Sequence, residues 1–172
     1  MPIDRTGLLG FLEAVDKELK RPITIVAVGG TAMTLLGLKT STIDIDFDLP
    51  TEYFSEFKKT ASSIPHGYRL DLYRGGMIFS QQLPSDYIEK SIAIKTKLKN
   101  ISLRALHPVD IVVTKAGRLD SRDTQDIEAC IREYKLTADQ IRKRSEAVQY
   151  AGREESYADN MRHVLKTFFQ EK

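Results

Sequence analysis

The stretch VGGTAMTLLGLKTSTIDIDFDLP, residues 28–50, contains the two patterns that decide the fold. The apolar run ITIVAV, residues 23–28, leads into it and predicts a buried strand. Gly29 and Gly30 follow directly and predict a tight turn. Residues 31–38 then predict a short helix that ends at a glycine. The first pattern is therefore a strand, a glycine turn and a helix.

A glycine turn of this kind is suited to binding phosphate. Gly29 and Gly30 carry no side chain, so a ligand can approach the main chain closely. The first N–H groups of the helix attract an anion, and Thr31 adds a hydroxyl donor. Most such turns only connect two elements, so the turn alone does not establish a site.

The second pattern is an alternation of apolar and acidic residues from Ile43 to Leu49. Ile43, Ile45 and Phe47 fall on one face of a strand, and Asp44, Asp46 and Asp48 fall on the other. We expect the apolar face to be packed and the acidic face to be open. Neighbouring carboxylates repel one another unless a cation lies between them. Mg²⁺ is usually held by one or two carboxylates, with substrate phosphates completing its shell. Asp44 and Asp46 are therefore candidate ligands of a metal–triphosphate complex.

The acidic alternation can also be a solvated strand face that binds no ligand. An EF-hand is excluded, because Leu49 stands where the loop needs glycine and Ser55 where it needs glutamate. The sequence also lacks the P-loop and the dinucleotide-binding glycine pattern.

The remaining periodicity predicts a mixed α/β (α+β) fold. Residues 1–107 are expected to form a small mixed sheet flanked by helices, and residues 108–172 a helical part packed on that core. Helices are predicted at 7–20, with Thr6 or Asp4 as N-cap, and at 51–63, with Thr51 as cap. Further strands are predicted at 68–73, 76–79 and 91–106, and further helices at 108–119, 122–134, 138–150 and 154–169.

The composition is that of an ordinary globular protein. Of the 172 residues, 41% are hydrophobic and 29% charged. The single cysteine, Cys130, excludes an intrachain disulfide and is expected to be buried. No apolar run reaches the roughly 20 residues that span a bilayer, and the first 20 residues lack the apolar core of a signal peptide. These features predict a cytoplasmic protein.

Two basic clusters stand out in a chain whose net charge is only +2. Arg142, Lys143 and Arg144 form a run, while Lys95, Lys97 and Lys99 alternate. Each cluster is either a solvated face or a surface for nucleic acid. The sequence leaves this choice open.

The pattern GG-T, followed by L-x-G, a basic residue and S-T-x-D-I-D, resembles the polymerase-β-like nucleotidyltransferase superfamily. More narrowly, it is similar to uncharacterised prokaryotic nucleotidyltransferases and to AbiEii-type toxins. The resemblance implies the nucleotidyltransferase fold. It also implies that the residues binding the nucleotide are Gly29, Gly30, Thr31, Lys39 and Thr42. The residues that it implies as metal ligands are Asp44 and Asp46. Lys39 stands where many relatives have arginine, which weakens a bidentate phosphate contact there.

A third carboxylate commonly completes such sites on a neighbouring strand. Asp71, in the alternating segment YRLDLY, occupies the expected place, with Leu70 and Leu72 as its packed neighbours. The resemblance therefore adds Asp71 to the metal ligands. An exposed aspartate without a role is the alternative.

The resemblance continues through HPVDIVVTKAGRLDSRDTQDI, residues 107–127, where AbiEii-like families carry a lysine, an arginine and a K/R-x-D-x-x-D-I pattern. Lys115, Arg118, Asp123 and Asp126 match those positions. The resemblance implies a catalytic Lys115 and nucleotide-binding roles for the other three. Lys115 and Arg118 are three apart, so on one helix both could reach a triphosphate. Asp123 could equally cap the next helix.

The implied reaction transfers a nucleoside monophosphate from a nucleoside triphosphate to an acceptor and releases pyrophosphate. The cofactor would be Mg²⁺ or Mn²⁺, bound by Asp44, Asp46 and Asp71, while Lys115 offsets charge on the pyrophosphate. The acceptor (RNA such as tRNA, a protein or a small molecule) is left open. The alternatives are a non-catalytic nucleotide-binding regulator, a toxin–antitoxin component with an antitoxin-like partner, and an RNA-binding module. A homodimer through the C-terminal amphipathic helix also stays open.

Overall fold

The computed structural model describes residues 1–152 and 154–171, which form two compact units. The first unit contains residues 1–75 and 88–106, and the second contains residues 76–87 and the chain from residue 107 onward. The predicted mixed α/β fold with helices in its C-terminal part is confirmed. The second unit takes in residues 76–87 as well as the helical part predicted from residue 108.

A mixed sheet is the frame of the first unit, with strand order β5-β4-β2-β9-β8. Its strands are β2 (Ile23–Ala27), β4 (Ile45–Leu49), β5 (Leu70–Arg74), β8 (Ile92–Ala93) and β9 (Ile101–Ala105). β2 is parallel to β9 and antiparallel to β4, and β4 is parallel to β5. The glycine turn after β2 therefore lies at the same end of the sheet as the start of β4, where the acidic residues are.

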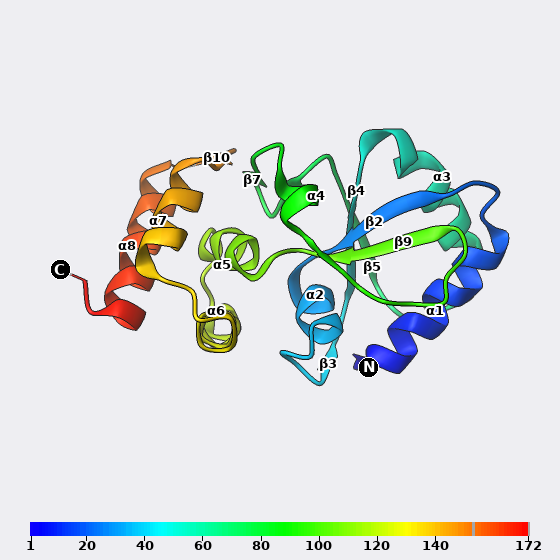
Figure 1. Ribbon diagram of the computed structural model, residues 1–172, viewed down its shortest axis with the longest axis horizontal. Coiled ribbons are helices and arrows are strands. Elements are labelled where there is room, and N and C mark those ends of the chain that lie inside the picture. Colours follow the sequence, from blue (N-terminus) through cyan, green and yellow to red (C-terminus); the bar gives the residue numbers. More distant parts are fainter. Residues whose placement is uncertain (153, 172) are drawn as a thin grey trace. The chain divides into compact units, whose positions relative to one another are not determined.

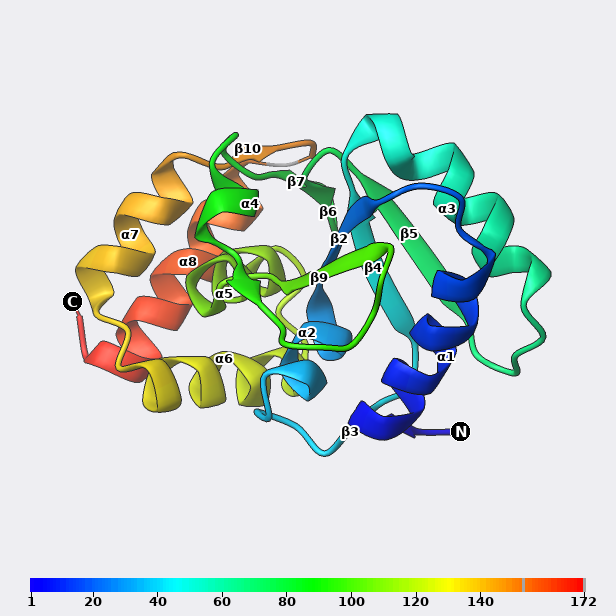
Figure 2. The ribbon, with the colours of Figure 1, turned by 45° about the vertical axis from the view of Figure 1, so that its right-hand side comes forward.

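Helices α1 (Arg5–Glu18) and α3 (Thr51–Ser63) lie side by side against this sheet (Figures 1 and 2). Asp4 caps α1 as predicted, because its side chain accepts a hydrogen bond from the N–H of Gly7. Phe57 of α3 packs edge-on against Phe47 of β4, with ring centroids 6.0 Å apart. α3 has the predicted bounds, but its N-cap is Pro50 and not Thr51.

The second unit is built around α5 (Pro108–Ala116), of which every residue is buried. This helix contacts each of the other three helices of the unit: α6 (Ser121–Tyr134), α7 (Ala138–Glu146) and α8 (Glu154–Phe169). Short strands β6 (Met77–Ile78), β7 (Gln81–Gln82) and β10 (Gln149–Tyr150) pair antiparallel in the order β10-β7-β6. The predicted helix 138–150 is thus too long, because residues 149–150 belong to a strand. The short helix α4 (Tyr87–Lys90) has its first residue in the second unit and the others in the first.

Burial of the acidic strand differs from the prediction. Ile43 lies before β4 and is 56% exposed, so it does not belong to the packed face. Asp46 is only 8% exposed and Asp48 is fully buried, so both faces of β4 are covered. The period-2 pattern identified which residues share a face, but not what covers that face.

Most other predictions about burial are confirmed. Cys130 is buried, and burial raises the pKa of its thiol to about 12. Of the apolar positions of α8 expected in the core, Met161, Val164 and Leu165 are buried, whereas Phe168 and Phe169 are half-buried. Among the described residues, no helix is both long enough and apolar enough to cross a membrane.

Two glycines give a matched test of packing in α-helical backbone. Gly117 has helical angles, φ −63° and ψ −29°, but a Cβ there would lie 1.7 Å from Nε2 of the fully buried Gln81. Gly117→Ala is therefore expected to destabilise the protein by about 1–3 kcal/mol, as overpacking does. Gly10, on the exposed side of α1, has no atom within 4 Å of an added Cβ. Gly10→Ala is expected to stabilise by about 0.5–1 kcal/mol. Urea denaturation measures the free energy of unfolding of both variants. Changes of the same sign in the two variants would contradict this prediction.

Candidate active site

The glycine turn has strict backbone requirements. Helix α2 (Gly29–Leu35) begins directly after β2, so both glycines belong to its first turn and not to a separate turn. Gly29 has φ +54°, a conformation that favours glycine. A Cβ on Gly30 would lie 2.5 Å from Oγ1 of Thr42. Both glycines are thus needed for the chain to approach the residues before Asp44.

Threonine hydroxyls hold the backbone of the acidic pair in place. Thr31 is fully buried, and its hydroxyl donates to the carbonyl of Asp44 at 3.2 Å while accepting from the N–H of Asp46 at 2.9 Å. Thr42 also donates to the carbonyl of Asp44, at 3.1 Å. The N–H of Val28 donates to the carbonyl of Asp46 at 3.1 Å. The start of α2 and the start of β4 are therefore joined by side-chain and main-chain hydrogen bonds.

The segment before Asp44 is fixed from its other side as well. β3 (Ser41–Thr42) pairs antiparallel with β1 (Ile3–Asp4). Lys39, which comes before this pairing, is half-buried, and its N–H donates to the carbonyl of Met33 at 3.2 Å. Gly37 follows α2 with φ +76° and ends the helix as predicted.

Asp46 and Asp71 lie directly opposite one another on the adjacent strands β4 and β5. Directly paired residues of neighbouring strands project to the same face with their Cβ atoms about 5 Å apart. Asp46 is buried apart from 8% of its surface, whereas the side chain of Asp71 is 30% exposed. Asp44 is half-buried and stands one residue before β4. The register thus brings the third predicted carboxylate to the strand position beside Asp46.

Arg69 is a charged neighbour of this site that the sequence reasoning missed. Its Nε lies 3.2 Å from Oδ1 and 3.1 Å from Oδ2 of Asp71. Asp71 raises the pKa of Arg69 most strongly, and the charges of Asp44 and Asp46 add to the effect. The signal in the sequence was the i, i+2 spacing of Arg69 and Asp71, which places both on one face of an extended segment. One exposed guanidinium therefore interacts with all three carboxylates.

The donor set fits a divalent cation in kind and number. In residues 1–152 and 154–171, no three His, Cys, Asp or Glu side chains are arranged to hold a metal ion by themselves. Mg²⁺ needs fewer protein ligands, because it is commonly bound by one or two carboxylates and completes its shell with phosphates and water. Asp46 and Asp71 on neighbouring strands meet that requirement, and Asp44 stands shortly before Asp46 in the chain. This fits a metal that binds together with a triphosphate.

Comparison with known families decides the class of the protein. Residues 7–171 match the model of the DUF6036 family, which is described as nucleotidyltransferases of unknown function. The chain belongs to this family. It is therefore an enzyme of the nucleotidyltransferase class, as the resemblance in the sequence implies. Membership of the polymerase-β-like superfamily stays a prediction. The narrower likeness to AbiEii-type toxins stays a prediction. No curated protein and no solved structure gave a significant match.

The second predicted cluster of this nucleotidyltransferase forms an ion-pair network inside the second unit. Lys115 is 3% exposed, and its Nζ lies 3.3 Å from Asp123 and 2.9 Å from Asp126. Arg118 binds both carboxylate oxygens of Asp123 at 2.8 Å. Burial alone would raise the pKa of Asp123, but Arg118, Lys115 and the N–H of Asp120 outweigh it and lower that pKa. All four predicted residues are thus brought together.

The geometry of this network differs from the expected one in one respect. α5 ends at Ala116 and not at residue 119, so Arg118 does not share a helix face with Lys115. Instead the Arg118 guanidinium lies over the ring of Phe79, 4.8 Å from its centroid. Asp123 also takes part in the capping box of α6 with Asp120, so the capping role predicted for it is confirmed.

Thr31 gives a direct test of how the acidic pair is positioned. Thr31→Val keeps the shape of the side chain but removes the hydroxyl, which leaves the buried N–H of Asp46 without its acceptor. We expect a loss of about 1–3 kcal/mol in unfolding free energy, because a buried polar group is left unsatisfied, and weaker Mn²⁺–nucleotide binding. Thr31→Ser is expected to restore most of both.

Thr34→Val is the matched control for that experiment. Thr34 is buried on the same helix, and its hydroxyl donates to the carbonyl of Gly30 at 2.8 Å without touching the acidic residues. Its loss should leave nucleotide binding unchanged. Equal effects of the two valine variants on binding would contradict the positioning role of Thr31. Chemical denaturation and calorimetric titration measure the two quantities.

Proposed function

We propose that this nucleotidyltransferase moves a nucleoside monophosphate from a nucleoside triphosphate to an acceptor hydroxyl and releases pyrophosphate. The observation that carries the proposal is the register of β4 and β5, which sets Asp46 opposite Asp71. Asp44 is held close to them by the hydroxyls of Thr31 and Thr42. In the reaction, the acceptor oxygen forms a bond to the α-phosphorus, and the bond from that phosphorus to the β-phosphate oxygen breaks.

Each part of the site has a task in this reaction. Asp44, Asp46 and Asp71 would hold Mg²⁺ or Mn²⁺, which when bound supplies positive charge between the carboxylates and the phosphates. Asp71 is the more exposed carboxylate of the strand pair, so it is the one we assign to accept the proton of the acceptor hydroxyl. Gly29 and Gly30 are assigned to the triphosphate from the family resemblance, and Gly30 is the more exposed of the two.

The roles of Lys39, Thr42 and the network of the second unit follow from the family resemblance alone. Arg118 has a side chain 49% exposed, so it can turn to a phosphate oxygen, and the buried carboxylate of Asp123 would then keep its ion pair with Lys115. Lys115 is held by two carboxylates in the interior, and release of its ammonium is more costly. We therefore propose that Arg118 is the residue of this network that binds the nucleotide. The groups that position Arg118 are Lys115, Asp123 and Asp126.

The reaction is tested by following two isotopic labels. Purified protein is incubated with α-³²P-labelled or γ-³²P-labelled ATP, CTP, GTP and UTP, with Mn²⁺, and with total RNA, total protein or a small-molecule extract. We expect the α label of at least one nucleotide to enter one acceptor fraction and the γ label to appear in pyrophosphate. EDTA should abolish both.

Two other results would count against the proposal. Entry of the γ label into an acceptor would indicate a kinase-type reaction. Tight nucleotide binding with no transfer of either label into any fraction would favour the non-catalytic regulator, including a component of a toxin–antitoxin pair. Asp46→Asn is the internal control, because its carboxylate is the most buried of the three proposed metal ligands.

A further inference from the structure

The structure distinguishes between the two basic clusters of the sequence. Arg144 is 9% exposed, and its guanidinium binds Asp110 and Asp86. Lys143 lies 2.9 Å from Asp139, and Arg142 forms ion pairs with Asp139 and Glu171. The charges of the run 142–144 are thus used within the second unit. This removes the main reason to regard that run as a surface for nucleic acid.

The alternating lysines are in a different situation. Lys95, Lys97 and Lys99 are all exposed, while the residues between them are half-buried. Across the described residues 1–152 and 154–171, no carboxylate forms an ion pair with any of these three ammonium groups. Three exposed ammonium groups therefore lie along this segment and face solvent.

The segment that carries these lysines is firmly anchored. It connects β8 to β9, and the N–H of Ile94 donates to the carbonyl of Leu103 at 2.9 Å. At its other end, the carboxylate of Asp16 on α1 accepts the N–H groups of Lys99, Asn100 and Ile101 at 2.9, 2.7 and 2.8 Å. The backbone is held at both ends, so binding a ligand would order only the lysine side chains.

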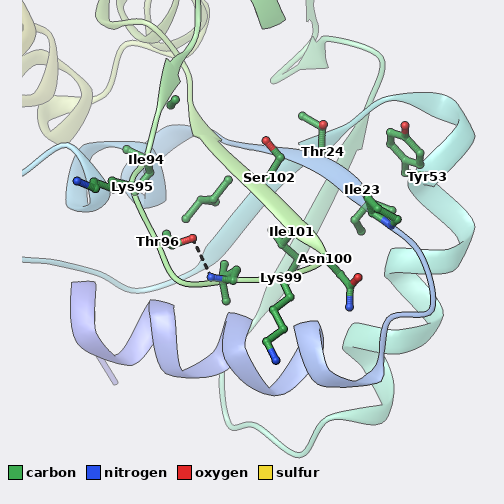
Figure 3. A pocket seen from close by; sticks show the side chains of 14 residues that line it. Ile23, Thr24, Tyr53, Ile94, Lys95, Thr96, Lys99, Asn100, Ile101 and Ser102 are labelled. Atoms are coloured by element: carbon green, nitrogen blue, oxygen red, sulfur yellow. Dashed lines mark hydrogen bonds between the residues drawn. The ribbon is translucent and has the colours of Figure 1, made fainter.

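A pocket of about 480 Å³ lies beside this segment, within the size range of ligand sites. Its wall includes Lys95 and Lys99 together with the polar side chains of Thr24, Ser102 and Asn100. Figure 3 shows Thr24 and Ser102 side by side on β2 and β9, and Lys95 and Lys99 near the two ends of the segment. The amide N–H groups of Asn100 are bonded to the carbonyls of Asp16 and Leu19. The hydroxyls of Thr24 and Ser102, in contrast, form no hydrogen bond within the part of the chain that the structure describes. Hydroxyl groups next to ammonium groups are suited to a sugar–phosphate chain.

The position of the pocket also fits a long ligand. Thr24 is at the beginning of β2, and the glycine turn follows the end of the same strand. Gly29 is the fifth residue after Thr24, which in extended chain corresponds to about 17 Å. A mononucleotide cannot bridge that distance, whereas several nucleotides of a single strand can.

We propose that segment 94–100 and the pocket beside it bind the sugar–phosphate backbone of a single-stranded nucleic acid, and that this strand is the acceptor of the transferred nucleotide. The assignment of this strand as the acceptor rests on the proposed function. The lysines act as an anchoring surface away from the reacting atoms. They therefore affect the KM for the acceptor, and not the binding of the nucleoside triphosphate.

Binding of fluorescently labelled, mixed-sequence 12-nucleotide RNA and DNA, measured by anisotropy over a range of salt concentrations, tests the surface. The variant Lys95→Gln/Lys97→Gln/Lys99→Gln is compared with Arg142→Gln/Lys143→Gln/Arg162→Gln, which removes the same charge from residues that are paired with carboxylates. The lysine variant should bind at least 10-fold more weakly. Its slope of log K against log salt should fall by about 2, given about 0.7 for each contact with a single strand. The control should bind like the parent protein.

The outcomes separate this inference from the proposed function. Equal weakening by both triple variants, or none by the lysine variant, would overturn the inference. So would equally tight binding of polyglutamate, which would indicate an acidic protein as the partner. Metal-dependent nucleotide binding is measured on the same samples, and its persistence in the lysine variant is expected. A parent protein that binds RNA or DNA but no nucleotide would overturn the proposed function and leave the surface in place.

Discussion

Asp46→Asn is expected to reduce nucleotidyl transfer by at least about 100-fold, because loss of a charged metal ligand removes several kcal/mol of transition-state stabilisation. Asp46 is only 8% exposed, lies opposite Asp71, and has its backbone held by Thr31. The amide has the same shape as the carboxylate but no negative charge. The variant should therefore transfer nucleotide more slowly and bind metal more weakly, but fold like the parent protein.

The control for this variant is an exposed carboxylate on the same unit. Glu13 lies on the exposed side of α1. It is distant in the sequence from the three aspartates of the proposed site and belongs to no strand of the sheet. Glu13→Gln should transfer nucleotide at the rate of the parent protein. The measurement is the initial rate of α-label transfer at saturating nucleotide, with circular dichroism to show that both variants are folded. A loss of less than about 10-fold in Asp46→Asn would exclude Asp46 as an essential ligand.

Arg144→Met is expected to lower the free energy of unfolding by about 3–5 kcal/mol. Arg144 binds Asp110 through Nε and Nη2, and Asp110 is fully buried in α5. Removing the guanidinium leaves a carboxylate in the interior with its main partner gone. A loss of this size is a large part of the 5–15 kcal/mol by which a typical domain is stable.

A double variant separates the ion pair from the packing around it. Asp110→Leu/Arg144→Met replaces both charges by apolar groups, and such replacements are often neutral or stabilising. We expect the double variant to be more stable than Arg144→Met alone. Urea denaturation of the single and double variants measures the coupling. A loss of about 1 kcal/mol or less in Arg144→Met would place this pair with ordinary surface salt bridges.

Local signals in the sequence were sufficient for most of the fold. The bounds of α3 and α8 agree with the prediction, because turn residues and helical spacing are read within a few neighbouring positions. The run at 23–28 predicted β2, and the acidic alternation placed Asp46 on a strand. The predicted end of α7 was wrong, because Gln149 and Tyr150 pair with β7 far away in the sequence.

The chemistry of individual side chains was harder to predict, because it depends on contacts between distant segments. Thr31 was expected to donate to phosphate, yet its hydroxyl is bonded to residues 13 and 15 positions away. Arg144 looked like part of a solvated run, but its partner Asp110 lies 34 positions earlier. The pairing of Asp46 with Asp71 followed from strand order, which the family resemblance supplied and periodicity alone could not.

The most direct test of the central claim is a titration of the protein with nucleoside triphosphates in the presence and absence of Mg²⁺ or Mn²⁺. Thermal unfolding reports binding, since a ligand at a hundred times its Kd adds about 2.7 kcal/mol of stability. We predict that at least one nucleotide stabilises the parent protein with metal but not with EDTA, and that Asp46→Asn loses this response. A folded parent protein that no nucleotide stabilises in the presence of metal would contradict the account.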